Sequence, residues 1–387
     1  MFTVILMRIG AFADSFSISL AEMVLGTMIL MALYKTYKTK DYTVYKKGFF
    51  IFYMMMILAE IISTFAGIDP ERSVKSFTSF WVMSYLPVVF VLFEGKDRMG
   101  YLMWVFAGSI MASVYGIGEF YVKHMERADG FFSHSLTYGN VLAMVCITAV
   151  GVIVYKCWET RRHLQITLVT LVLGSAALIL SASRGPILAF IIVTFVMCVI
   201  RYRWRGLLVG LIAASILAGV ICEVPKVEGR FADTIKNIHN PQTSIGTRIV
   251  LWEATSKAIM VRPWFGYGKR NFQSVINNYI AVPTLSRAHA HNSYLQYTFL
   301  HGFFGLFALM GFLISLFYEM SKRARSKPFV RIAVYVLIVY LLEGLTENNF
   351  TDSEVVMMCY SLIGVMLSPG VITKTLKKDD STEFELS

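Results

Sequence analysis

The sequence has 387 residues, of which 56% are hydrophobic and 16% charged, and its mean hydropathy is +0.60. A water-soluble protein of this length cannot hide that much apolar surface, so the composition excludes a soluble enzyme and indicates a chain embedded in a bilayer. The formal net charge is +11, but most basic residues lie in short connections between apolar runs, which argues against a nucleic-acid partner. The five cysteines stand singly, with no spacing typical of a zinc site or a disulfide framework.

Eleven apolar runs approach the length of about twenty residues that a helix needs to cross the hydrocarbon core. They lie at 15–34, 48–67, 76–93, 100–122, 136–155, 164–182, 186–200, 206–222, 293–318, 330–347 and 354–372. Residues 2–14 form an apolar stub that is too short and too polar to cross alone, so eleven or twelve spans are expected. The predicted fold class is all-α, a polytopic transmembrane helical bundle.

The basic residues divide unevenly between the two sides of this bundle. One set of alternate connections, together with the tail, carries 21 Lys and Arg, whereas the short connections of the other set carry 5. The positive-inside rule therefore places the first set and the C-terminus in the cytoplasm, and the connection after the eighth run outside.

This topology divides the chain into four parts. An N-terminal transmembrane region is expected over 1–222, a large outer (periplasmic) helical loop over 223–292, a C-terminal transmembrane region of three spans over 293–372, and a cytoplasmic tail over 373–387.

The outer loop carries nine basic residues against four acidic ones. Loops longer than about 60 residues cross the membrane largely regardless of charge, so the excess needs a separate cause. Anionic lipid headgroups are one explanation, since basic residues near a membrane surface are attracted to them. A binding site for a diphosphate is the other.

Two helices are predicted inside this loop. Thr247 is a plausible N-cap for a helix over 248–261, and Pro263 forbids its continuation. Arg248 then falls in the first turn, where the helix terminus already carries partial positive charge, so an anion bound there would relieve the repulsion. After the turn at 266–268, an apolar stripe (Phe272, Val275, Ile276 and Tyr279) predicts a helix lying on the membrane surface or on the bundle.

Polar residues at the outer ends of the spans are further candidates for function. Arg184 starts the seventh span, as a binding residue or as an arginine that snorkels in a tight turn. His289 and His291 close the loop, where a neutral imidazole suits removal of a proton from a sugar hydroxyl, and Asn292 follows them. No third ligand stands at a recognisable spacing, so no metal is expected.

Acidic residues lie at the outer end of the tenth run and inside two early spans. Glu347 belongs to a cluster that can pair with the loop arginines or orient a substrate hydroxyl; its other members are Glu343, Asn348, Asn349, Asp352 and Glu354. Glu22 and Glu60 lie inside spans, where they can satisfy each other or a neighbouring backbone.

Several short motifs, in order, resemble the superfamily of O-antigen ligases and Wzy-like O-antigen polymerases over roughly residues 50–365. They are Asp129-Gly130-Phe131-Phe132-Ser133-His134, Ser183-Arg184-Gly185-Pro186, Gly246-Thr247-Arg248-Ile249-Val250-Leu251-Trp252, Arg262-Pro263-Trp264-Phe265-Gly266-Tyr267-Gly268, and His291-Asn292-Ser293-Tyr294-Leu295-Gln296 followed by Gly302 and Gly305. Ligases of this family usually have twelve full spans, and here the first is reduced to a stub.

The resemblance implies a GT-C type membrane glycosyltransferase. It implies an inverting, metal-independent and cofactor-free transfer of a glycan from undecaprenyl diphosphate to an acceptor, at the periplasmic face of a bacterial inner membrane. By position, Arg184 and Arg248 match arginines that hold the diphosphate, and His291 matches the histidine proposed to activate the acceptor hydroxyl. His289 is its less favoured substitute, and Arg262, Arg270, Asn292 and Glu347 are secondary candidates.

The acceptor divides the remaining functional hypotheses. An O-antigen ligase that transfers glycan to a lipid A-core sugar is favoured, with a polymerase that extends the growing lipid-linked glycan as the alternative. Transfer to a protein hydroxyl is a third possibility. A transporter of lipid-linked sugars is disfavoured, because no internal repeat is visible and the polar cluster gathers outside the bundle.

Overall fold

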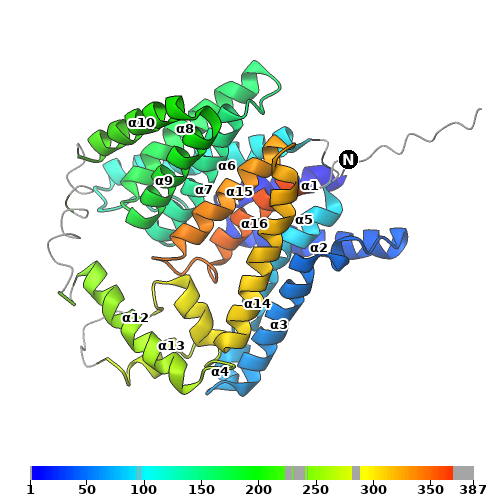
Figure 1. Ribbon diagram of the computed structural model, residues 1–387, viewed down its shortest axis with the longest axis vertical. Coiled ribbons are helices and arrows are strands. Elements are labelled where there is room, and N and C mark those ends of the chain that lie inside the picture. The colour runs from blue at the N-terminus through cyan, green and yellow to red at the C-terminus, as the bar shows by residue number, and fades with distance from the viewer. Residues whose placement is uncertain are drawn as a thin grey trace, which may run out of the picture.

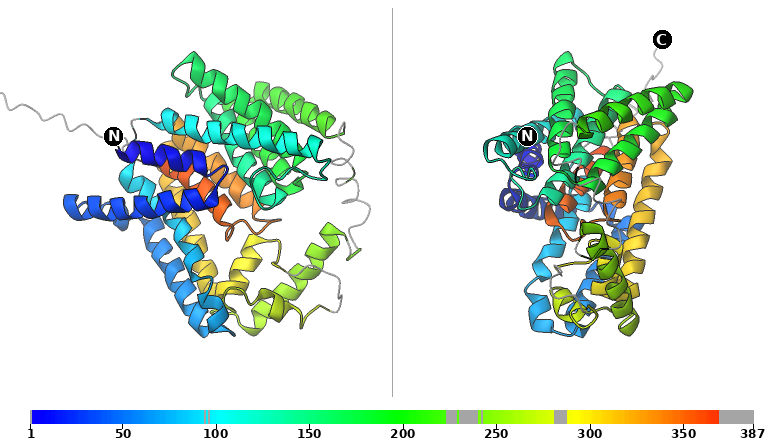
Figure 2. Two further views of the ribbon diagram at one scale, coloured as in Figure 1. Left: turned by 180° about the vertical axis from the view of Figure 1, so that it is seen from behind. Right: turned by 90° about the vertical axis from the view of Figure 1, so that its left-hand side faces the viewer.

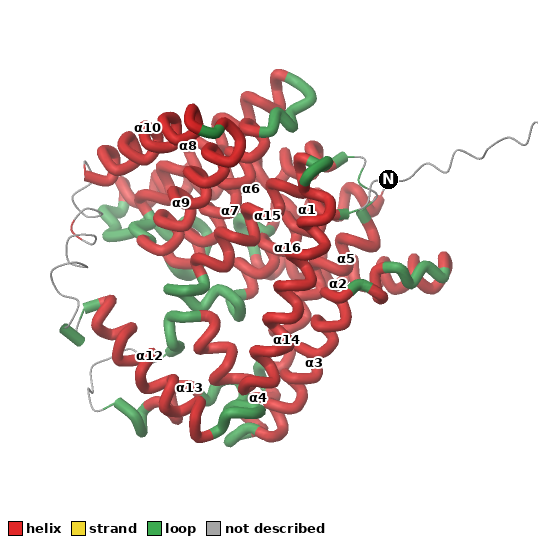
Figure 3. Tube along the Cα trace, in the orientation of Figure 1, coloured by secondary structure: helices red, strands yellow, loops and turns green. Residues whose placement is uncertain are grey.

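The computed structural model describes residues 2–93, 95, 97–222, 229, 240–241, 243–280 and 288–368. Within these ranges every regular element is a helix (Figure 3). Seven of the described helices are long and apolar enough to cross a membrane, namely α2, α3, α6, α7, α8, α9 and α14. The predicted all-α, multi-pass membrane fold is therefore confirmed.

The predicted apolar runs coincide with helices along the chain. In order, these are α2 (Ile18–Thr39), α3 (Gly48–Ala66), α5 (Tyr85–Leu92), α6 (Arg98–Val122), α7 (Ser135–Val154), α8 (Arg161–Leu180), α9 (Arg184–Tyr202), α10 (Trp204–Cys222), α14 (Ser293–Ala324), α15 (Pro328–Glu343) and α16 (Ser353–Leu367). Short helices η1 (Val44–Lys46), α4 (Pro70–Val74) and η2 (Phe77–Ser84) connect the early ones. The third run is thus divided between a 3-10 segment, η2, and α5.

The N-terminal stub forms a helix of its own, α1 (Phe2–Ala13), 12 residues long. At a rise of about 1.5 Å per residue it is too short to cross the hydrocarbon core. It packs against α2 and α6, and Gly108 of α6 comes so close that a Cβ there would meet the carbonyl oxygen of Phe12 at 2.5 Å.

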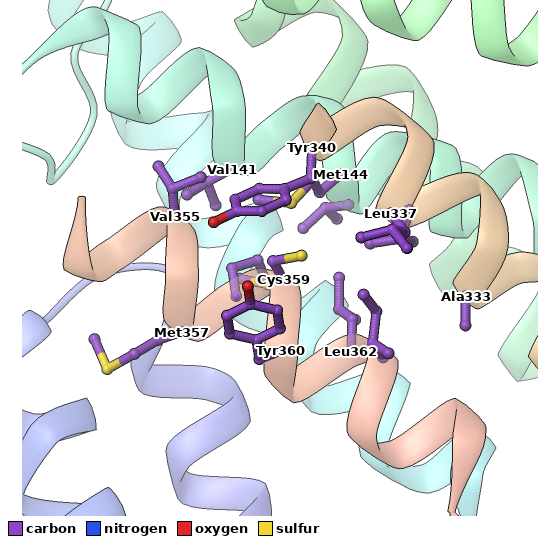
Figure 4. Packing of buried hydrophobic residues seen from close by; sticks show 14 of the residues in the cluster. Val141, Met144, Ala333, Leu337, Tyr340, Val355, Met357, Cys359, Tyr360 and Leu362 are labelled. Carbon is purple, nitrogen blue, oxygen red and sulfur yellow. The ribbon is translucent and has the colours of Figure 1, made fainter. Parts of the chain in front are cut away.

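Helix α7 forms the centre of the bundle. It packs against α8, α9, α15 and α16, and 94% of its 18-residue apolar window is buried. Association between helices in a lipid environment depends on close packing rather than on escape from water, which favours small residues at the contacts. Gly151 illustrates this, because a Cβ on it would come within 2.8 Å of Ile332 on α15. Figure 4 shows the adjoining layer, in which Val141 of α7 and Tyr340 of α15 lie above Cys359 and Tyr360 of α16.

The predicted grouping of connections by side agrees with the contacts between them. At one end of the bundle, Lys47 pairs with Glu319 at 3.0 Å, and a guanidinium nitrogen of Arg98 donates to the carbonyl oxygen of Ser368 at 2.6 Å. These basic connections belong to the set assigned to the cytoplasm.

The opposite end gathers the connections assigned to the outside. There the backbone N–H of Ala128 donates to the carbonyl oxygen of Leu180 at 2.9 Å, and the N–H of Ser293 donates to that of Gly344 at 2.7 Å. The assignment of this end to the periplasm itself rests on the positive-inside rule.

The described part of the large loop contains α12 (Ser244–Val261) and α13 (Phe272–Ile276). Together with the start of α14 they surround a second apolar cluster that includes Leu251, Phe272, Ile276 and Phe299. The predicted stripe therefore faces α12 and α14 of the chain itself. Figures 1 and 2 show both helices on the same side of the molecule, near the start of α14, and the part of α14 after Gly302 runs beside α3.

The predicted N-cap of α12 is wrong. The helix begins at Ser244, and the side chain of Thr243 accepts the cap hydrogen bond from the N–H of Gly246. Thr247 is already helical, and its hydroxyl donates to the carbonyl oxygen of Pro241 at 2.9 Å. Arg248 accordingly lies beyond the first turn, so the proximity of a helix terminus gives no reason to expect an anion beside it.

Helix α14 is broken at Gly302, whose φ is +66°. The segment before α13 fills the break: the N–H of Tyr267 donates to the carbonyl oxygen of Phe299, and the N–H of Phe303 donates to that of Pro263, at 3.0 and 2.6 Å. The loop thus satisfies backbone groups at the break, as buried backbone groups require. These hydrogen bonds also fix the loop to the bundle.

Glu60 of α3 takes part in this attachment. Its carboxylate lies 3.1 Å from the Lys269 ammonium and 3.4 Å from Nε2 of His301. The expectation that Glu60 is satisfied by Glu22 or by a neighbouring backbone is wrong, because the loop delivers a lysine to it from 209 positions away along the sequence.

Candidate active site

A cleft of about 450 Å³ opens where three outer connections converge. The start of α7, the segment just before α14, and the loop between α15 and α16 all contribute to it. Its lining consists of His134, Leu136, Thr137, Asn140, Ala288, His289, His291, Glu347, Asn348, Thr351 and Asp352. Most of these residues carry hydrogen-bond donors or acceptors, which suits the hydroxyl groups of a sugar.

A buried hydrogen-bonded junction holds the α15–α16 loop against the start of α14. The hydroxyl of Ser293 lies 2.8 Å from the carbonyl oxygen of Glu347 and 2.6 Å from Oδ1 of Asn349, and it accepts from the N–H of Asn349 at 2.9 Å. Asn349 in turn donates to the carbonyl oxygen of Tyr340 at 2.8 Å. Because Ser293 is two residues after His291, this junction fixes the histidine relative to Glu347.

His291 lies in the left-handed region of the backbone, with φ of +49°. Non-glycine residues adopt this conformation at a cost, and it persists only where the surroundings impose it. The side chain lines the cleft, and its Nδ1 lies 3.4 Å from Oε2 of Glu347. A hydrogen bond from Nδ1–H to this carboxylate leaves Nε2 as the nitrogen that can accept a proton.

His289 stacks obliquely on His291, with ring centroids 4.1 Å apart. Its Nδ1 accepts a hydrogen bond from the backbone N–H of His291 at 3.3 Å, so the proton of the neutral ring is on Nε2. Burial, and secondarily the neighbouring His291, lowers its pKa to about 4. At neutral pH His289 therefore presents a donor to the cleft, which makes it a poorer base than His291.

Arg248 forms an ion pair with Oε1 of Glu347, and both side chains are largely buried, 14% and 4% exposed. The same carboxylate thus contacts Arg248 with one oxygen and His291 with the other. The expectation that an acid of the α15–α16 loop pairs with a loop arginine is confirmed for Glu347.

Arg184 is the first residue of α9, as the sequence predicts. Its guanidinium donates to the hydroxyl of Ser244 at 3.0 Å. Ser244 and Arg248 stand four positions apart on α12, which places them on one face of that helix. A continuous row therefore runs from Arg184 along α12 to Arg248, and through Glu347 to His291, although neither arginine lines the cleft itself.

The secondary candidates are distributed more widely. Arg262 donates to the carbonyl oxygen of Ala66 at 3.2 Å, away from the cleft, and Arg270 lines a different cleft. The side chain of Asn292 caps α14 by accepting from the N–H of Leu295, and it donates to the carbonyl oxygen of Leu345, each at 3.0 Å. Asn292 therefore stabilises the start of α14 and its contact with the segment after α15.

Asp352 belongs to the acidic cluster that the sequence predicts to pair with the loop arginines or to orient a substrate hydroxyl, and it lines the cleft. It caps α16 by accepting from two backbone N–H groups, and its other oxygen accepts from the hydroxyl of Thr137 at 2.6 Å. Burial raises the pKa of this carboxyl group. A helix-capping signal before the last apolar run is visible in the sequence, but the contact with Thr137 is not.

The described residues contain no group of three or more His, Cys, Asp or Glu side chains arranged to hold a metal ion. The predicted independence from metals remains a prediction.

Part of the sequence that forms this cleft matches a known protein family. Residues 169–310 match the family model Wzy_C, described as O-antigen ligase. This part of the chain is similar to O-antigen ligases. No curated protein matches the chain.

The O-antigen ligase match extends from within α8 to within α14 and contains Arg184, Arg248, His289 and His291. His134 and Glu347, which complete the cleft, lie outside it. The resemblance to the superfamily of ligases and polymerases is thereby confirmed, and it supports a membrane enzyme of ligase or polymerase type that acts on lipid-linked glycans.

Proposed function

We propose that this protein is an O-antigen ligase-like glycosyltransferase, moving a glycan from undecaprenyl diphosphate to a lipid A-core sugar at the periplasmic face of the bacterial inner membrane. The observation that carries the proposal is the contact of one buried carboxylate, Glu347, with both Arg248 and His291 beside an open polar cleft. In this proposal the base is His291, the cation for the leaving diphosphate is Arg248, and both contact the same carboxylate.

In the proposed reaction, the acceptor hydroxyl oxygen attacks the anomeric carbon of the donor sugar from the face opposite the diphosphate. The carbon–oxygen bond to the diphosphate breaks, and its electron pair leaves with undecaprenyl diphosphate, so the anomeric configuration inverts. The hydroxyl proton passes to Nε2 of His291. Glu347, bonded to Nδ1, stabilises the resulting imidazolium and holds the ring in the orientation the transfer requires.

The two arginines neutralise the charge that develops on the departing diphosphate. A planar guanidinium fork matches phosphate oxygens in a bidentate manner, and fixed cations at a developing charge lower the barrier directly. Glu347 forms an ion pair with Arg248. Donor binding supplies a second anion for this guanidinium, and His291 remains next to the carboxylate.

This mechanism assigns no step to a metal ion or cofactor. The ligase and the polymerase then differ in the acceptor that they use.

The test is transfer by the purified full chain in nanodiscs containing EDTA, with undecaprenyl-diphosphate glycan as donor. Core lipid and a second donor molecule are offered separately as acceptors. Glycan on the core lipid supports the ligase, and a lengthened lipid-linked glycan identifies a polymerase. Absence of any product, or activity only without chelator, contradicts the proposal.

A further inference from the structure

A second cleft, of about 360 Å³, adjoins the candidate active site. Its volume is within the range of small-ligand pockets. Ala288 and Thr351 line both clefts, so a ligand that passes between these two residues can occupy both at once. The other side of the second cleft is formed by α13 and the turn before it.

The described residues that line this cleft carry hydrogen-bonding groups and positive charge, and none of them is acidic. The Lys269 ammonium is paired with Glu60, outside the lining, at 3.1 Å. Arg270 is exposed, and the described residues offer it no acidic partner. The cleft thus presents a cation that is available to an anion from outside.

Gln296 adds a buried group that points to a ligand. The side chain is 4% exposed, and its amide oxygen accepts from the N–H of Ala290 at 2.9 Å. This bond fixes the orientation of the amide, and within the described part of the chain no acceptor is found for its nitrogen. The amide lines the cleft, where its N–H₂ group can donate to an oxygen of a ligand.

The backbone of Arg270 has an unusual conformation. Its φ is +61°, a conformation that side-chain-bearing residues adopt rarely. The neighbouring Asn271 is buried and donates to the hydroxyl of Ser73 and to the carbonyl oxygen of Tyr267, at 3.1 and 2.8 Å. The turn that presents Arg270 is therefore held by its neighbours.

We propose that this second cleft is a subsite for a negatively charged sugar, with a carboxylate or phosphate group bound by Arg270 and hydroxyl groups bound by Gln273 and Gln296. This sugar is adjacent to the reacting one in the same glycan, because the two clefts join at Ala288 and Thr351. The inference rests on the proposed glycan transfer. The charged sugar belongs either to the donor glycan or to the acceptor, and steady-state kinetics distinguishes the two.

The test compares wild type with Arg270→Gln, Arg270→Lys and Gln273→Ala. All three substitutions change exposed side chains. Lys257→Gln is the matched control, because it removes one positive charge from the same loop at a residue that lines neither cleft. Arg270→Gln should raise the KM for one of the two substrates about tenfold with kcat retained, and Arg270→Lys should restore part of the loss. A rise in donor KM assigns the charged sugar to the donor, and a rise in acceptor KM to the acceptor.

Binding without turnover separates this inference from the proposed function. Saturation-transfer NMR on the full chain in nanodiscs uses glucose 6-phosphate as the probe and glucose as the uncharged comparison. The phosphate-dependent signal should be lost in Arg270→Gln and retained in Arg248→Ala, even if no glycan transfer is found. Unchanged KM values for both substrates in Arg270→Gln would overturn the subsite. So would a signal lost in Arg248→Ala but kept in Arg270→Gln.

Discussion

His291 and Glu347 lie 56 positions apart in the sequence, yet Nδ1 of the imidazole is 3.4 Å from Oε2 of the carboxylate. The separation is at the long end of hydrogen-bond distances. We infer from this contact that His291 is the base and that Glu347 positions it.

His291→Ala should lower kcat for glycan transfer by at least roughly 10²-fold, because a general base contributes about that much or more. Donor binding should persist, since the arginines are unchanged. Turnover and the Kd for undecaprenyl-diphosphate glycan are measured on the same nanodisc preparation. His289→Asn is the control, expected to keep most of the activity because the amide oxygen can still accept from the N–H of His291. A greater loss in the control would transfer the role of base to His289.

Glu347→Gln should lower kcat by roughly 10²-fold, because the amide cannot stabilise the imidazolium that forms during transfer. The KM for donor should change much less. Glu347→Asp, which keeps the charge, should recover part of kcat. A purely structural role predicts instead that stability and kcat fall together in both variants, which thermal unfolding monitored alongside kinetics would reveal.

Arg184→Lys and Arg248→Lys should each weaken transfer by about tenfold or more, since an ammonium group cannot form the bidentate contacts of a guanidinium. This loss of transfer activity should be seen with donors that carry a diphosphate, because the arginines are proposed to bind that group. The comparison variant is Arg262→Lys, whose guanidinium contacts Ala66 and lies over the ring of Tyr267 instead of reaching the row that leads to the cleft. Equal effects in all three variants would mean that the charge of the loop alone matters.

Protonation of His289 should make the protein less stable as the pH falls. Its pKa is lowered from 6.5 to about 4 by burial, so the unfolded chain binds the proton more readily between these values. Stability contributed by the neutral ring is complete above pH 6.5 and declines as the pH falls towards 4. His289→Asn should reduce the drop in melting temperature between pH 7 and pH 5. An identical drop in wild type and variant would contradict the assignment.

Gly302→Ala should destabilise the protein by roughly 1–3 kcal/mol, because a side chain is strained at its φ of +66°. The added Cβ would also meet the backbone of Trp264 at 2.2 Å. Gly118→Ala in α6 is the matched control: nothing lies within 4 Å of its Cβ position, and alanine favours the helix. Thermal unfolding of the two variants should shift in opposite directions.

Much of the fold is readable from the sequence because the signals are local. An apolar run of about twenty residues predicts a helix by itself, and all eleven runs coincide with helices, of which seven in the described part of the chain are long and apolar enough to cross a membrane. The sidedness of the connections follows from counts of Lys and Arg, and the stripe of Phe272, Val275 and Ile276 predicts the buried face of α13. Each of these inferences needs only residues that are neighbours in the chain.

The partners of the charged groups were decided only by the tertiary structure. The sequence identified Arg248, His291 and Glu347 as candidates, but their meeting depends on α12, the start of α14 and the α15–α16 loop converging. In the same way, the lysine that reaches Glu60 comes from a loop that is distant along the sequence. An ion pair or a hydrogen bond forms wherever packing brings two groups within a few ångströms. The hydrophobic periodicity of a single helix does not predict how close its residues lie to residues of another helix.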